Sequence, residues 1–200
     1  IWSVIMAGFR VELIDVDRET LNLDLDDFAK KLTSDVSAVF LVHLLGNTCD
    51  IEKLQKICFD KKVLILEDCC ESLGTKYNSN FVGTFGLASS FSFFFAHHMV
   101  TMEGGMILTQ DAEFAHRCKL LRAHGWSRTS QKTIKDMDFR NRYNFVNWGF
   151  NVRPTELQAG FGYPITALAS LNVLYQGVYG NDPKLKFYTA TKTASISNIP

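Results

Sequence analysis

The alternation of short apolar runs with amphipathic helical segments is the feature that most constrains the fold of this chain. Residues 38–45 (AVFLVHLL) and 63–66 (VLIL) are continuous apolar runs of strand length, and residues 50–59 between them repeat apolar side chains with helical spacing. Continuous apolar runs are typical of parallel strands that are covered by helices on both faces. The pattern therefore predicts an α/β sheet with right-handed crossovers.

Other segments extend this pattern. Residues 11–16 (VELIDV) alternate like a half-buried strand, and residues 24–32 have the polar start and apolar spacing of a short amphipathic helix. Asp50 stands at the N-cap position of the helix predicted at 50–59. The remaining predicted elements are strands at 89–95 and 105–109, a helix at 111–122 capped by Asp111, and a helix start near Pro154.

Composition excludes several classes of protein. Lys plus Arg equals Asp plus Glu at 21 each, so no excess charge suggests binding to nucleic acid or to a membrane surface. No apolar run is long enough to cross a bilayer, and the N-terminus lacks the features of a signal peptide. The five cysteines form no CxxC pair, which favours buried thiols in a reducing cytoplasm. We expect a cytoplasmic protein without a metal site. The apolar start at Ile1 suggests a fragment.

Reactive side chains follow two of the predicted strands. Asp68 ends the strand-like run at 63–66, and ligands of open α/β sheets bind beyond the carboxyl ends of the strands. The spacing fits equally well with Glu67 and Asp68 capping a following helix. The stretch 89–106 (SSFSFFFAHHMVTMEGGM) runs from β-forming residues into His97 and His98 and then into a glycine turn. This order is unusual for a plain structural hairpin, although two histidines that only cap a loop remain the alternative.

Eight segments in order carry a family resemblance. They are a VDVD-like strand, VHLLGN, ILEDCCES, VGTFG, SFSFFFAHH, EGGMILT, LLRAHG and WGFNVRPTELQAG, which together span roughly residues 5–162. This order resembles the DegT/StrS family of sugar aminotransferases, which are pyridoxal-phosphate (PLP) enzymes of fold type I. The resemblance implies an aspartate aminotransferase-like large domain over residues 1–162, with a mixed, mostly parallel sheet flanked by helices. The family's upstream phosphate-binding turn has no counterpart here, and residues 163–200 read as a divergent or truncated tail.

His97 departs from the family pattern. Ordinary members carry a lysine at this position, which binds PLP covalently, and an imidazole cannot form that Schiff base. The chain thus resembles the subgroup of nucleotide-sugar 3-dehydratases, which remove the C3 hydroxyl of a 4-keto-6-deoxyhexose in dideoxysugar (lipopolysaccharide O-antigen) biosynthesis. That resemblance implies non-covalent PLP and pyridoxamine phosphate (PMP), a nucleotide-sugar substrate and L-glutamate as amino donor. His97 is the predicted catalytic residue, since an imidazole can take up and return a proton at neutral pH. The branch that uses an iron–sulfur cluster is disfavoured, because residues 122–138 contain no cysteine.

The resemblance also implies roles for matching positions. Asp68 matches the aspartate that pairs with the pyridine nitrogen of the cofactor, and Ser92 matches a serine that binds its phosphate. Asn151 matches an asparagine that reaches the cofactor of the neighbouring subunit, which implies a homodimer with a shared active site. Glu71 matches a position beside the cofactor ring, where a structural role is nearly as plausible.

Three further histidines carry weaker hypotheses. His98 contacts either the sugar or only the backbone, and His124 is a candidate for substrate binding. His43 belongs to the core or lies behind the residues that touch the cofactor.

Two other functions stay open. The chain could be an aminotransferase whose PLP lysine lies elsewhere, at Lys76, Lys119 or Lys132, but none of these follows an SFS-type strand. It could also be a non-catalytic relative, because a fold alone does not fix a function. The sequence identifies neither the nucleotide nor the hexose.

Overall fold

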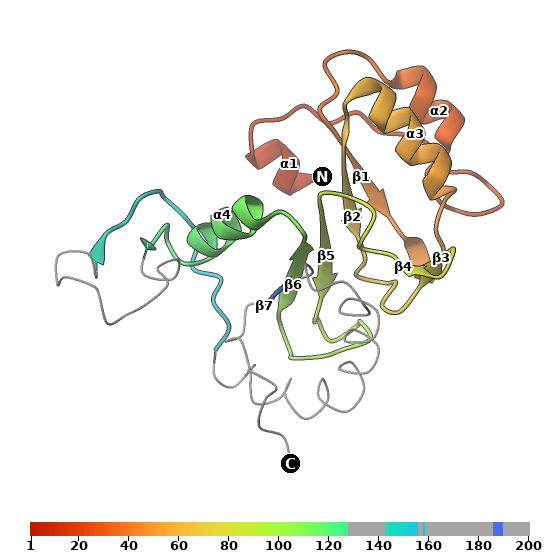
Figure 1. Ribbon diagram of the computed structural model, residues 1–200. Helices are drawn as coiled ribbons and strands as arrows, with labels where there is room; N and C mark the ends of the chain where they lie inside the picture. The colour runs from red at the N-terminus through yellow and green to blue at the C-terminus, as the bar shows by residue number, and fades with distance from the viewer. Residues whose placement is uncertain (128–142, 156–157, 159–185, 190–200) are drawn as a thin grey trace.

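A five-stranded sheet forms the framework of the computed structural model, which describes residues 1–127, 143–155, 158 and 186–189 (Figure 1). The strand order is β1-β2-β5-β6-β7. The first three strands run parallel, and β6 and β7 pair antiparallel with their neighbours, so the sheet is mixed. The strands are β1 (Ala38–Val42), β2 (Leu64–Asp68), β5 (Ala88–Ser92), β6 (Gly105–Thr109) and β7 (Lys186–Thr189).

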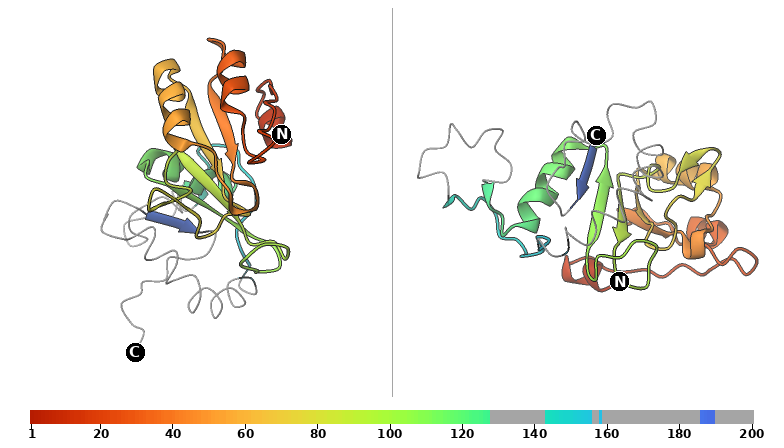
Figure 2. Two further views of the ribbon diagram at one scale, coloured as in Figure 1. Left: turned by 90° about the vertical axis from the view of Figure 1, so that its right-hand side faces the viewer. Right: turned by 90° about the horizontal axis from the view of Figure 1, so that it is seen from below.

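Three of the four predicted helices are confirmed, and the helix predicted to begin near Pro154 lies mostly outside the described residues. The confirmed helices are α2 (Leu25–Lys31), α3 (Ile51–Lys61) and α4 (Ala112–Arg122), and shorter elements are α1 (Trp2–Met6), η1 (Leu44–Gly46), β3 (Lys76–Tyr77) and β4 (Asn80–Phe81). An aspartate caps each of the three: the side chains of Asp24, Asp50 and Asp111 accept hydrogen bonds from backbone N–H groups of the first turn. Helices α2 and α3 lie together over β1 and β2, whereas α4 lies beside β6 at the other end of the sheet (Figures 1 and 2).

The two faces of the sheet differ in their cover. Side chains that face α2 and α3 are buried, and Leu41 and Leu108 are at most 1% exposed. Alternate residues point to the other side, where Phe40 of β1 is 50% and Leu64 of β2 is 51% exposed, while Ala88 of β5 and Thr109 of β6 are buried. We call these the covered face and the open face. The prediction that β1 is covered on both faces is therefore wrong for the described part of the chain.

Three strand predictions need correction. Residues 11–16 form no strand among the described residues; Val16 makes only an isolated bridge with Leu23, across a turn in which Asp17 accepts N–H groups. The apolar run at 38–45 splits into β1 and η1, because Leu45 adopts a left-handed conformation with φ 52°. The strand predicted at 89–95 ends at Ser92.

Two other features complete the fold. Strand β7 lies in the segment to which the sequence assigned no element, and it pairs with β6. All five cysteines are free, as expected, and Cys49, Cys58 and Cys69 are buried. Among the described residues, no helix has both the length and the apolar character needed to span a membrane.

Candidate active site

The carboxyl ends of β1, β2 and β5 meet at one edge of the sheet, because these strands are parallel. Asp68 is the last residue of β2, and it pairs in register with Val42 of β1 and Ser90 of β5. Its half-buried side chain lies on the open face, where its Oδ1 accepts a hydrogen bond from Cys70 N at 3.1 Å. Burial, together with the Asp68 carboxylate, raises the pKa of the Cys70 thiol to about 12. The thiol therefore stays protonated at neutral pH.

Ser92 ends β5 at the same edge. It lies two residues beyond Ser90, so its side chain shares the open face with Asp68. The Oγ atom accepts a hydrogen bond from Phe94 N at 3.2 Å, which turns the chain out of the strand. The structure thus brings two of the predicted site residues to one side of one edge.

Residues 93–104, which we call the His97 loop, connect β5 to β6 above this edge. Phe93 N donates to Gly104 O at 2.9 Å and Thr101 N donates to Phe93 O at 3.0 Å, so the base of the loop is closed. The His97 ring is partly buried and meets the Phe94 ring at a centroid distance of 6.4 Å. His98, by contrast, is exposed.

Glu71 ties two loops of the edge together. Its Oε2 accepts a hydrogen bond from Leu45 N at 3.0 Å, across 26 residues of sequence. Leu45 is 78% exposed and left-handed, which is rare for a bulky side chain. Glu71 therefore stabilises the turn after β1, beside Asp68. The predicted position of Glu71 near a cofactor ring did not include this contact.

His124 and Asn151 lie in a second cluster at the end of α4. The Asn151 Oδ1 accepts hydrogen bonds from the Arg153 guanidinium at 3.0 and 3.2 Å, and Arg153 Nη2 lies 3.5 Å from His124 Nε2. Residues 143–155, which we call the arm, extend from this end of the molecule (Figure 1). Among the described residues, neither His124 nor Asn151 has a hydrogen bond to Asp68, Ser92 or the His97 loop.

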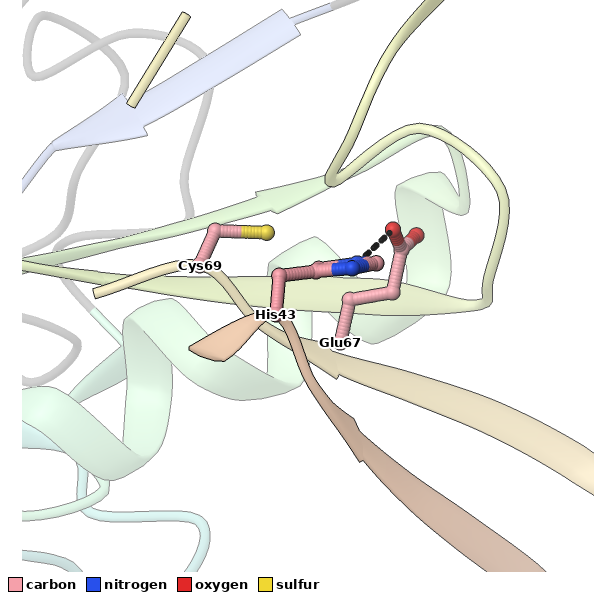
Figure 3. Close-up of side chains that lie close together, drawn as sticks. All are labelled: His43, Glu67 and Cys69. Atoms are coloured by element: carbon pink, nitrogen blue, oxygen red, sulfur yellow. Dashed lines mark hydrogen bonds and ion pairs between the residues drawn. The ribbon is translucent and has the colours of Figure 1, made fainter. Parts of the chain in front are cut away.

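Sequence reasoning missed the partners of Glu67. This side chain is completely buried on the covered face, where it bonds to His43 and to the turn at residues 83–86 (Figure 3). The alternative that Glu67 caps a following helix is wrong, because both of its carboxylate oxygens form hydrogen bonds with residues 16 to 24 positions away. The VGTFG motif was the available signal, since a turn with two glycines offers closely spaced N–H groups.

The ligand atoms of His43, Glu67 and Cys69 lie within 4.8 Å of one another, but the donor chemistry does not suit a metal ion (Figure 3). Both Glu67 oxygens already accept hydrogen bonds. Burial also raises the pKa of the Cys69 thiol, whereas metal ions bind the thiolate. We interpret this cluster as a hydrogen-bonded network in the core.

Comparisons with known proteins match this chain to one family and to several solved structures. A model of the DegT/DnrJ/EryC1/StrS aminotransferase family matches residues 2–175. The GDP-4-keto-6-deoxy-D-mannose 3-dehydratase of Yersinia pseudotuberculosis is 42% identical over 163 residues, which are 78% of this chain and 41% of that protein.

Two solved structures of GDP-4-keto-6-deoxymannose 3-dehydratase are also similar. The E. coli enzyme with bound hydrated PLP matches with a TM-score of 0.76 and 34% identity over 91% of this chain and 50% of that one. A second structure, with a trapped PLP-glutamate geminal diamine, has the same TM-score and identity and covers 91% of this chain and 51% of the other. The chain thus spans about two fifths of the length of its curated relative and half of these structures.

Proposed function

This chain belongs to the DegT/DnrJ/EryC1/StrS aminotransferase family, and we propose that it is the PLP-binding large-domain part of a nucleotide-sugar 3-dehydratase. Residues 1–162 make up that part, and the substrate is a nucleotide-linked 4-keto-6-deoxyhexose. One observation carries the proposal: His97 lies in the loop directly after β5. The family resemblance assigns the PLP lysine of ordinary members to this position. The similarity to two-fifths of a GDP-4-keto-6-deoxy-D-mannose 3-dehydratase supports it.

The side chains at the edge of the sheet fit PLP or PMP, held without a covalent bond. The Asp68 carboxylate, half-buried on the open face, suits a protonated pyridine nitrogen. The Ser92 hydroxyl, at the end of β5, suits a phosphate oxygen. Glu71 holds the neighbouring turn in place, and we assign it to the same binding site. When bound, PMP supplies the amine that condenses with the C4 ketone and the ring that accepts electron density.

His97 supplies proton transfer in this proposal. A ring nitrogen of His97 accepts a proton from carbon and then delivers it to the departing C3 hydroxyl, so one side chain serves as base and acid. The His97 ring is partly buried against Phe94, which limits the access of water to it. The hydrogen bonds at the base of the His97 loop fix the position of the ring. The net reaction balances when one glutamate becomes 2-oxoglutarate and ammonia for each C3–O bond that is replaced by C3–H. His98 and His124 are assigned weaker roles in binding the sugar nucleotide.

We further propose a homodimer. The arm exposes aromatic side chains: Trp148 is 74%, Phe145 is 53% and Phe150 is 52% exposed. Solvent-exposed aromatic clusters of this kind mark interaction surfaces. A second copy that covers the arm would bring Asn151 toward the neighbouring site. The same proposal places the protein in the cytoplasm, in the synthesis of dideoxysugars for lipopolysaccharide.

The test is the mass of the sugar product. The protein is incubated with PLP, glutamate and GDP-4-keto-6-deoxymannose, and the product is analysed together with released 2-oxoglutarate. We expect loss of one oxygen from the sugar with stoichiometric 2-oxoglutarate. An amino group gained with the hydroxyl retained would instead establish an aminotransferase. No change with this sugar or with its CDP counterpart would reject both activities for this chain.

The aminotransferase remains the second candidate, because the family as a whole carries that name. Dialysis separates the two. A lysine-linked cofactor absorbs visible light and resists dialysis, whereas the proposed non-covalent PMP does neither. Retention of a visible chromophore after dialysis would favour the aminotransferase.

A further inference from the structure

The Glu67 carboxylate is completely buried and has four hydrogen-bond partners. Gly83 N donates to Oε2 at 2.6 Å, and the backbone N–H groups of Phe85 and Gly86 each donate to Oε1 at 2.7 Å. Backbone N–H groups that converge in this way form an anion-binding nest. The nest suits the carboxylate anion, so the fourth partner, His43 Nε2 at 3.0 Å, is the nitrogen that carries hydrogen.

His43 contacts both Glu67 and Asp68. Its ring holds the Glu67 side chain on the covered face (Figure 3), and its backbone N–H donates to the carbonyl oxygen of Asp68 at 3.1 Å. The other ring nitrogen, Nδ1, lies 2.9 Å from Thr48 Oγ1, so the ring has a partner at each end. His43 therefore fixes β2 at the residue where the Asp68 side chain leaves for the open face.

The turn that supplies the nest has no space for side chains at its two glycines. A Cβ atom added to Gly86 would lie 2.4 Å from Ile65 O, and one added to Gly83 would lie 2.9 Å from the Phe91 ring. Ser89 Oγ also donates to Gly83 O at 2.8 Å. Because the turn leads directly into β5, the nest fixes β5 against β2 beside Asp68.

We propose that Glu67 and His43 are positioning residues that set the place and direction of the Asp68 carboxylate. Both are completely buried on the covered face, so they act through the backbone of Asp68 and through strand pairing. The role of Asp68 toward the cofactor rests on the proposed function. The constraint on Asp68 itself rests only on the contacts of the network.

The test compares two network variants with one control. Glu67→Gln keeps the shape of the side chain but turns an NH2 group toward N–H donors. Thr48→Val removes the partner of His43 Nδ1 and a longer bond to Cys49 O at 3.4 Å but leaves Glu67 in place, so it provides a milder variant if the first does not fold. Leu54→Ala is the control, because the Leu54 side chain of α3 is completely buried in the hydrophobic core and makes no hydrogen bond to the network.

Two measurements are made at a temperature at which all variants are folded. Amide hydrogen exchange follows residues 68–70 and 83–86, and titration gives the dissociation constant and absorbance of added PLP. We expect Glu67→Gln to accelerate exchange in these segments and to raise the PLP dissociation constant, each at least about tenfold. Thr48→Val changes both in the same direction by less. Leu54→Ala changes the PLP dissociation constant less than about twofold, and any faster exchange that it causes is not confined to these two segments.

Exchange in these segments no faster than in Leu54→Ala would overturn the proposal. Faster exchange with unchanged PLP affinity and absorbance would also overturn it, because the network would then be merely structural. If the unmodified chain binds no PLP, the proposed function fails for this chain, while faster exchange in Glu67→Gln still supports the positioning of Asp68.

Discussion

Glu67 and Asp68 are neighbouring carboxylates on one strand, and the sheet separates them. Glu67 points to the covered face, has no exposed side-chain surface and accepts four hydrogen bonds. Asp68 points to the open face, is half-buried and accepts a hydrogen bond from Cys70 N. A buried charge must have its partners within the protein, whereas an accessible charge can bind a ligand. The comparison assigns stability to one face of the sheet and chemistry to the other.

Removing each carboxylate in turn is the most direct way to break this comparison. Glu67→Ala leaves three buried N–H groups and His43 without an acceptor, and we expect it to lower the free energy of unfolding by about 3–5 kcal/mol. Asp68→Ala removes a hydrogen bond at a half-exposed site and should cost about 1 kcal/mol. Urea denaturation measures both. Equal losses would contradict the division of the two faces.

Two neighbouring apolar residues on β6 allow the same comparison of the two faces with uncharged side chains. Leu108 is 1% exposed on the covered face, and Ile107 is 40% exposed on the open face. We expect Leu108→Ala to cost about 2–5 kcal/mol, because it leaves a cavity, and Ile107→Ala to cost less than about 1.5 kcal/mol. Thermal unfolding of the two variants decides this. A larger loss for Ile107→Ala would mean that the open face is covered in solution.

The smallest expected effect concerns pH and the helix over the covered face. The Asp50 carboxylate caps α3, and hydrogen bonds from Lys53 N and then from the Tyr77 hydroxyl lower its pKa below the usual value of 3.8. A lowered pKa in the folded state gives stability that is complete above the unfolded pKa and is lost as pH falls through the folded one. Asp50→Asn should therefore flatten the loss of stability below pH 3.8. Acid titration of the unfolding free energy tests this, with the exposed Asp60→Asn on the same helix as control. A loss as steep as in the unmodified chain would contradict it.

Local signals in the sequence predicted the parts of the fold that depend on nearby residues. The caps at Asp24, Asp50 and Asp111 bind N–H groups two or three residues away, so their sequence context suffices. The residues 11–16 alternate correctly yet form no strand in the described part of the chain, because a strand needs a partner and alternation does not provide one. Whether the second face of β1 is covered likewise depends on other segments, so the apolar run of β1 could not predict it.

The candidate site divides in the same way. The placement of Asp68 and Ser92 at a strand end follows from parallel topology, and the sequence indicated it. The network around Glu67 joins residues 16 to 24 positions apart, and no periodic pattern encodes such pairs. Sequence reasoning therefore left His43 between two interpretations, and only the three-dimensional structure shows that its ring is buried against Glu67 while its backbone bonds to Asp68.

The proton-transfer role of His97 is the central claim, and the rate of sugar deoxygenation in His97→Ala tests it most directly. The variant is compared with the unmodified protein at saturating PLP, glutamate and GDP-4-keto-6-deoxymannose, with bound cofactor measured in both. We predict a loss of about 10²–10⁴-fold in rate with cofactor binding retained, because the loop keeps its backbone hydrogen bonds while the imidazole is gone. An unchanged rate would contradict the account, since the proton would then be carried by another group.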